Sequence, residues 1–111
     1  DVKLMVARSL EKFGYRVLTA ANGQAGLDAL EADSEIDMLL TDVLLPGGMN
    51  GPQVADRATA ENPELRVLFM SGYARDTIIE QGRLQADVRL LSKPFVPAEL
   101  GRRVRETLDD A

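Results

Sequence analysis

Residues 37–43 read Asp-Met-Leu-Leu-Thr-Asp-Val, and this stretch decides the fold class. It is an apolar run that is closed by a polar pair and a valine, which is typical of a strand buried on both faces of a parallel sheet. Residues 66–70 (Arg-Val-Leu-Phe-Met) and 88–92 (Val-Arg-Leu-Leu-Ser) have the same character. The sequence therefore predicts three buried strands that belong to one parallel sheet.

Apolar residues at helical spacing precede, separate and follow these strands. They predict helices over residues 2–13, 25–32, 52–61, 77–84 and 96–108. Residues 16–20 (Arg-Val-Leu-Thr-Ala) are apolar and β-branched, which predicts a further short strand. Helices and strands thus alternate along the whole chain, and this order predicts an α/β fold with helices on both faces of a parallel sheet.

Length and composition limit the possible functions. The chain has 111 residues, which is enough for one domain, and we expect residues 1–111 to form it. The net charge of −5 argues against a nucleic-acid surface. Cysteine and histidine are both absent, so thiolate or imidazole chemistry would have to come from a partner. No apolar run reaches the length of a membrane span, and we expect a cytoplasmic location without membrane contact.

The residues that close the three buried strands suggest where the chemistry lies. Asp42 closes the first, Ser71 follows the second, and Lys93 follows the third. Ligands of open α/β sheets bind beyond the carboxyl ends of the strands. A carboxylate there can act as a nucleophile, while a hydroxyl and an ammonium can meet the charge of a phosphoryl group. Each residue alone is more commonly a turn or loop residue, but the three together point to phosphoryl transfer.

The same residues carry a family resemblance. The chain resembles the bacterial response-regulator receiver domain in residues 41–46 (Thr-Asp-Val-Leu-Leu-Pro), 49–51 (Met-Asn-Gly), 71–74 (Ser-Gly-Tyr-Ala) and 93–95 (Lys-Pro-Phe), and in the junctions at 14–17 and 20–23. The resemblance covers nearly the whole chain. It implies a flavodoxin-like sheet of strand order 2-1-3-4-5. The loop over residues 45–52 is especially similar to receivers attached to hybrid sensor histidine kinases.

The resemblance also implies a role for each site residue. Asp42 would be the phosphoacceptor, which takes a phosphoryl group from the phosphohistidine of a histidine kinase or histidine phosphotransfer domain. Leu44 would offer its backbone carbonyl to a Mg²⁺ cofactor that Asp42 also binds. Ser71 would bond a phosphoryl oxygen in the active state, and Lys93 would pair with the phosphoryl group. The peptide bond between Lys93 and Pro94 is expected to be cis.

Leu4 is expected to contribute to partner docking. It lies off the apolar stripe of the first helix, whose predicted core positions are Val2, Met5, Val6, Leu10 and Phe13. This end of the helix is expected beside the site, where a helical phosphohistidine partner would insert apolar contacts.

The sequence departs from the family pattern in three places. Receivers begin with a buried strand that ends in two acidic Mg²⁺ ligands, and here the first helix starts at once, so we expect that strand to be absent from this sequence. The chain is then either an N-terminally incomplete receiver, which we favour, or a receiver with a degenerate site. Leu90 stands where many receivers have a switching aromatic residue, and Tyr73 is a weak substitute. The loop over 46–51 is lengthened at Gly47 and Gly48.

The absence of the first strand implies that the 111-residue chain is poorly stable, or borrows a strand from another copy, and binds Mg²⁺ weakly. Three other functions remain open. A receiver that no longer takes phosphate could act as a protein-interaction module. A nucleotide or flavin-binding protein is disfavoured, because no strand is followed by G-x-G-x-x-G or a P-loop. A phosphohydrolase would need a further acid or base near Asp42.

Overall fold

The computed structural model describes residues 2–72 and 89–109. Its helices and strands, in chain order, are α1 (Val2–Lys12), α2 (Gly23–Ala32), β1 (Met38–Asp42), α3 (Gly51–Glu61), β2 (Arg66–Ser71), β3 (Leu90–Ser92) and α5 (Pro97–Asp109). The helix predicted over residues 77–84 lies outside the described residues, as does Tyr73. Otherwise the predicted helices and the three buried strands are present, with ends shifted by up to two residues.

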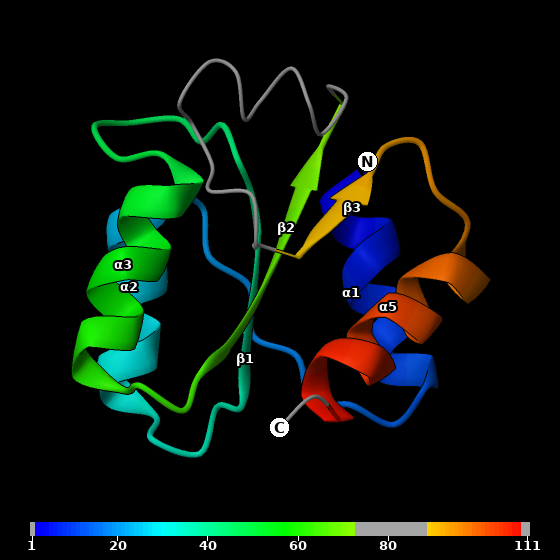
Figure 1. The fold of residues 1–111 in the computed structure, drawn as a ribbon, viewed down its shortest axis with the longest axis horizontal. Coiled ribbons are helices and arrows are strands. Elements are labelled where there is room, and N and C mark those ends of the chain that lie inside the picture. The colour runs from blue at the N-terminus through cyan, green and yellow to red at the C-terminus, as the bar shows by residue number, and fades with distance from the viewer. Residues whose placement is uncertain (1, 73–88, 110–111) are drawn as a thin grey trace.

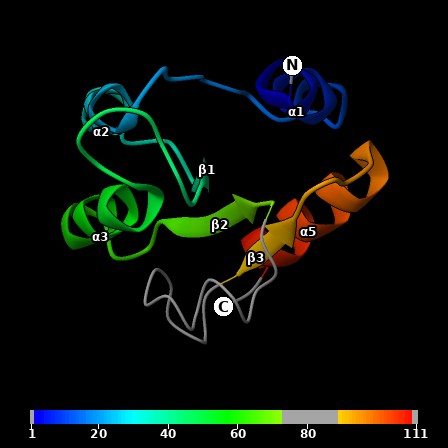
Figure 2. The same ribbon diagram turned by 90° about the horizontal axis from the view of Figure 1, so that it is seen from above.

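The three strands form a parallel sheet in the order β1-β2-β3. Helices α2 and α3 lie on one side of the sheet, and α1 and α5 lie on the other (Figures 1 and 2). This is the predicted open α/β architecture, and the three strands follow one another as the last three do in the expected order 2-1-3-4-5. The first strand of that order is not present in the described part of the chain, as the sequence predicted.

Strand β2 carries the core on both of its faces. Leu68 and Met70 belong to a cluster with side chains of α1 and α5, while Phe69 belongs to a second cluster with Ala55 of α3. Successive side chains of a strand point to opposite faces, so this division is the expected result of a strand that is covered on both sides. The prediction of a buried parallel strand is therefore confirmed.

Local chemistry explains where the helices begin and end. Gly14 has a φ of +97°, a left-handed conformation that glycine adopts without strain, and α1 ends two residues before it. The side chain of Asn22 accepts a hydrogen bond from the backbone N–H of Ala25 at the start of α2. At the start of α3, Asn50 and Gln53 form a reciprocal capping box.

The strand predicted over residues 16–20 is wrong. The segment is extended but pairs with no strand among the described residues, and it is held instead by Lys3, whose Nζ donates to the carbonyl oxygen of Ala20 over 3.0 Å, and by an ion pair between Arg16 and Asp33. A strand needs a neighbour for its backbone hydrogen bonds. In the order 2-1-3-4-5 the second strand has the first as its only neighbour, and residues 2–72 and 89–109 do not include that strand.

Two of the predicted core positions of α1 are also wrong. Val6 and Leu10 are buried, but Val2 is 46% exposed and Phe13 is 50% exposed. Val2 lies in the first turn, at the end of the helix. Phe13 lies beyond the last turn, and one edge of its ring approaches Gly101 of α5 while the rest faces solvent.

Candidate functional site

The carboxyl ends of the three strands meet at one edge of the sheet. Asp42 is the last residue of β1, Ser71 is the last residue of β2, and Lys93 directly follows β3. Asp42 is in register with Met70, and Ser71 is in register with Ser92. All pairs are parallel, so the three residues singled out in the sequence arrive at the same edge.

Backbone hydrogen bonds hold this edge together just beyond the regular strands. The N–H of Val43 donates to the carbonyl of Met70 over 3.0 Å, and the N–H of Lys93 donates to the carbonyl of Ser71 over 2.7 Å. Both bonds continue the parallel ladders by one residue past Asp42 and past Ser92. The positions of Asp42 and Lys93 are therefore fixed by the backbone as well as by their side chains.

The side chains of Asp42 and Lys93 form an ion pair. The Nζ of Lys93 lies 2.5 Å from Oδ1 of Asp42, and the two side chains are 28% and 38% exposed, respectively. Within the described residues Oδ1 is buried and accepts no hydrogen bond of acceptable geometry, so the lysine charge is what offsets its burial. Since Oδ1 is covered, the exposed part of the carboxylate includes its second oxygen, Oδ2.

Ser71 is 6% exposed and lies at the end of the central strand, between the strands that carry Asp42 and Lys93. Its neighbours along β2, Met70 and Phe69, pack into the core on either face. The Ser71 hydroxyl is therefore carried by a strand that is packed on both faces.

The loop after β1 returns to the sheet at α3. The N–H of Gly51 donates to the carbonyl of Val43 over 2.8 Å. A methyl group on Gly51 would lie 2.0 Å from the carbonyl oxygen of Asp42, so only glycine permits this approach. From the sequence, Gly51 was expected at the end of the loop, within the segment 49–51 that resembles the family, and not as the first residue of α3. The spacing of Asn50 and Gln53 is the pattern of a capping box and could have marked the helix start there.

The described residues offer few ligands for Mg²⁺. They contain no group of three His, Cys, Asp or Glu side chains that could hold a metal ion. What they place at the end of β1 is the carboxylate of Asp42, one oxygen of which already contacts Lys93. Mg²⁺ is commonly held by one or two carboxylates, waters and substrate phosphate. The residues thus fit a weak site that would be completed by phosphate oxygens.

Leu90 is buried, at 5% exposed, in the same cluster as Phe69. The cluster also contains Ala55, so the Leu90 side chain packs with residues of β2 and α3. The structure also has the Lys93–Pro94 peptide bond in the cis form, which confirms that prediction. The helices of the described part of the chain include none that is long and apolar enough to cross a membrane.

Three groups at this edge form a set that is suited to phosphoryl chemistry. They are a carboxylate with one open oxygen, an ammonium in contact with it, and a hydroxyl on the strand between them. The carboxylate can attack a phosphorus atom, and the other two groups can meet the charge on the phosphoryl oxygens. No imidazole or thiol is present in the chain to act in their place.

Comparisons with known proteins agree with this geometry. The model of the response regulator receiver domain matches residues 1–105. The response regulator receiver protein CpdR of Brucella abortus is 32% identical over 97% of this chain and 88% of its own length. The sensor kinase CckA of the same organism is also 32% identical over 97% of this chain, which spans only 11% of that kinase.

The crystal structure of a response regulator receiver protein from Sinorhizobium medicae superposes with a TM-score of 0.83 at 27% identity, covering 97% of this chain and 86% of that one. The match of the family model, the similarity to relatives along nearly the whole chain, and the shared open parallel sheet lead to one conclusion. This chain belongs to the family of response regulator receiver domains of two-component signalling.

Proposed function

We propose that this receiver takes a phosphoryl group onto Asp42 from the phosphohistidine of a histidine kinase or histidine phosphotransfer domain, and that this switches a surface for partner binding. The observation that carries the proposal is the contact between Asp42 and Lys93 at the edge where Ser71 also ends its strand. The similarity to the sensor kinase CckA and to the response regulator receiver protein CpdR fits either a fused or a separate partner. A cytoplasmic location belongs to the same proposal.

The chemistry follows from the two oxygens of the carboxylate. Oδ1 is buried against Lys93, so Oδ2 is the oxygen that attacks phosphorus. A bond forms between Oδ2 and phosphorus while the bond between phosphorus and the donor nitrogen breaks, and the proton that neutralises the departing imidazole comes from solvent. Phosphorylation lowers the negative charge on the Asp42 carboxylate, and Lys93 then pairs with a phosphoryl oxygen instead. Ser71 donates its hydroxyl to a second one.

Asp42 and the carbonyl of Leu44 would hold Mg²⁺, together with the phosphoryl oxygens and water. When bound, the ion neutralises charge between the two reacting anions. With a single carboxylate from the described residues, the affinity of the chain for Mg²⁺ is expected to be low before the phosphoryl group arrives. The protein catalyses its own modification and is not an enzyme acting on an external substrate.

The test is labelling by a small phosphoryl donor, with Asp42→Asn as the variant and Asp37→Asn as the matched control. Asp37 immediately precedes β1 and is exposed, at the opposite end of the strand from Asp42. In a form extended by a family first strand with two terminal acids, the otherwise unchanged chain and Asp37→Asn should be labelled and should bind beryllium fluoride, while Asp42→Asn should do neither. Labelling that persists in Asp42→Asn would show that another residue is the acceptor.

The scarcity of metal ligands in the described residues supports one second candidate, a receiver that acts as a protein-interaction module without phosphate. The two functions differ in a simple way. If neither the chain nor a form extended by a family first strand with two terminal acids is labelled, while both still bind a partner kinase, the second candidate is correct.

A further inference from the structure

Thr41 is a buried polar residue directly before Asp42, at 7% exposed. Its cross-strand partner on β2 is Phe69, and Leu39 and Val43 share its face of β1. All three belong to, or pack against, the apolar cluster on the side of the sheet that α3 covers. A polar side chain thus lies in a row of residues that is otherwise apolar.

Packing alone would favour valine at this position. Valine has nearly the same shape as threonine, with a methyl group in place of the hydroxyl, and the next residue on this face, Val43, is a buried valine. Burying a hydroxyl costs free energy unless the group finds a hydrogen-bond partner. The presence of threonine is therefore explained by what its hydroxyl contacts.

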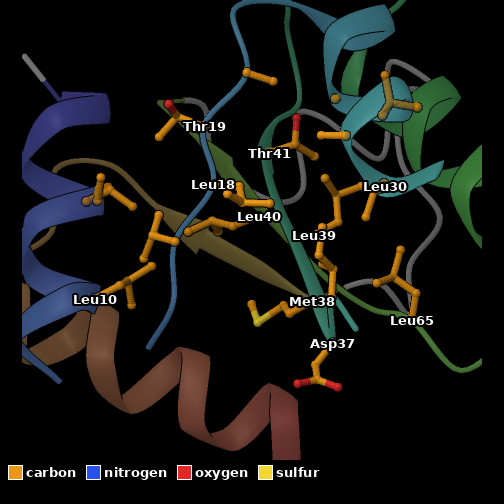
Figure 3. Close-up of a pocket in the computed structure, with 18 of the residues that line it drawn as sticks. Leu10, Leu18, Thr19, Leu30, Asp37, Met38, Leu39, Leu40, Thr41 and Leu65 are labelled. Atoms are coloured by element: carbon orange, nitrogen blue, oxygen red, sulfur yellow. The ribbon is translucent and has the colours of Figure 1, made fainter. Parts of the chain in front are cut away.

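The hydroxyl of Thr41 contacts the backbone of the next residue. Its Oγ1 donates to the carbonyl oxygen of Asp42 over 3.0 Å. Figure 3 shows the oxygen of Thr41 pointing along β1 toward the carboxyl end of the strand, where Asp42 follows. The hydrogen bond therefore links a buried side chain to the residue that carries the carboxylate of the site.

The carbonyl that accepts this bond belongs to the peptide unit between Asp42 and Val43. The other end of the same unit is held as well, because the N–H of Val43 donates to the carbonyl of Met70 over 3.0 Å. Gly51 of α3 lies so close to the carbonyl oxygen of Asp42 that a Cβ would not fit between them. The peptide unit cannot rotate without breaking one of these bonds or meeting α3. Its orientation sets the ψ angle of Asp42, and hence the path of the chain beyond the carboxylate.

We propose that Thr41 is a positioning residue for phosphoryl transfer, which acts through the backbone carbonyl of Asp42. The hydrogen bond fixes the peptide unit that follows Asp42, and with it the direction in which the carboxylate meets Lys93 and the phosphoryl donor. Rates of such reactions depend steeply on the alignment of the reacting atoms. The inference rests on the phosphorylation of Asp42 that is proposed above.

The test compares Thr41→Val, which removes the hydroxyl and keeps the shape, with Thr41→Ser, which keeps the hydroxyl and removes a methyl group. Both are made in the form extended by a family first strand with two terminal acids, and the rate of labelling by a small phosphoryl donor is measured beside Tm. Thr41→Val should be labelled about two- to tenfold more slowly, which corresponds to the net contribution of one hydrogen bond, at a Tm close to that of the unchanged extended chain. Thr41→Ser should be labelled at the unchanged rate although its Tm falls by several degrees, because a buried methyl group is lost.

Thr107→Val is the matched control. Thr107 is also buried, and its Oγ1 donates to the carbonyl of Arg103 over 2.7 Å within α5, on the other side of the sheet from Thr41. This variant loses the same kind of hydrogen bond, and its labelling rate should not change. Equal rates for Thr41→Val and the unchanged extended chain, or rates that follow Tm across the three variants, would overturn the inference and leave Asp42 as the acceptor. Absence of labelling in the unchanged extended chain would overturn the proposed function, and the inference with it.

Discussion

Replacing Gly51 by alanine should disrupt the connection between the phosphoacceptor strand and α3. A Cβ at this position would meet the carbonyl oxygen of Asp42 at 2.0 Å and the Cα of Val43 at 3.1 Å. Both contacts are with backbone, which cannot rotate away as a side chain can. Since Cβ contacts under 3.0 Å essentially do not occur, the start of α3 must move away from Asp42 by at least 3.0 − 2.0 = 1.0 Å.

The size of the effect follows from two losses. A shift of this size breaks the 2.8 Å hydrogen bond from Gly51 to Val43, which costs about 0.5–1.5 kcal/mol. Overpacking at a site that cannot yield adds about 1–3 kcal/mol. The free energy of unfolding should therefore fall by about 1.5–4.5 kcal/mol, and Tm should fall by about 4–8 °C for each kcal/mol.

The assay is urea or thermal unfolding of Gly51→Ala beside Gly48→Ala. Gly48 lies in the same loop, and a methyl group there meets nothing within 4 Å. Gly48→Ala should therefore leave stability almost unchanged. Phosphoryl labelling of Gly51→Ala should also fall, because the displaced backbone is that of Asp42. Equal stability of the two alanine variants would refute the reasoning.

Three further predictions concern the surroundings of the site. Leu44 is 48% exposed beside Asp42 and is a bulky group that cannot position water, so Leu44→Asn should speed loss of the phosphoryl group; equal or slower loss would count against a role for Leu44. Leu4 is 49% exposed near the amino end of α1, and Leu4→Asp should slow transfer from the partner kinase while labelling by a small donor is unchanged; equal loss with both donors would indicate misfolding. The hydrogen bond from Arg16 lowers the pKa of the Asp33 carboxyl below 3.8, so an NMR titration should find it depressed in wild type and raised by Arg16→Gln. Because the folded-state pKa is the lower one, the stabilisation by this pair is present above the unfolded value and is lost as the pH falls through the folded pKa. An Asp33 pKa that is the same in Arg16→Gln as in wild type would contradict this prediction.

The sequence was sufficient where residue type and strand burial pointed the same way. The apolar run that ends at Asp42 can bury its side chains only if other elements cover both faces of the strand. The structure places it in a parallel sheet with helices on both sides. Parallel strands bring their carboxyl ends to one edge. For that reason the contact between Asp42 and Lys93, 51 positions apart in the chain (93 − 42), follows from topology without any knowledge of side-chain detail.

The sequence was insufficient where the structure of a segment depends on an element from another part of the chain. Residues 16–20 have the composition of a strand, but strand propensity is expressed only beside a neighbour, and the described chain supplies none. The half-exposure of Phe13 depends on how its ring lies against Gly101 of α5, which periodicity within one helix does not reveal. The close passage of Gly51 over Asp42 likewise depends on the path of a loop, and a glycine in a loop sequence is too common to signal it.

The central claim is that Asp42 itself receives the phosphoryl group, and one chemical measurement tests it most directly. The chain, extended by a family first strand that carries the two expected acids, is incubated with a phosphoryl donor and Mg²⁺ and then reduced with borohydride, which converts an aspartyl phosphate to homoserine. Peptide mass spectrometry then locates the converted residue. The account predicts homoserine at position 42 and at no other acidic residue. Conversion at a different carboxylate, with position 42 intact, would contradict it.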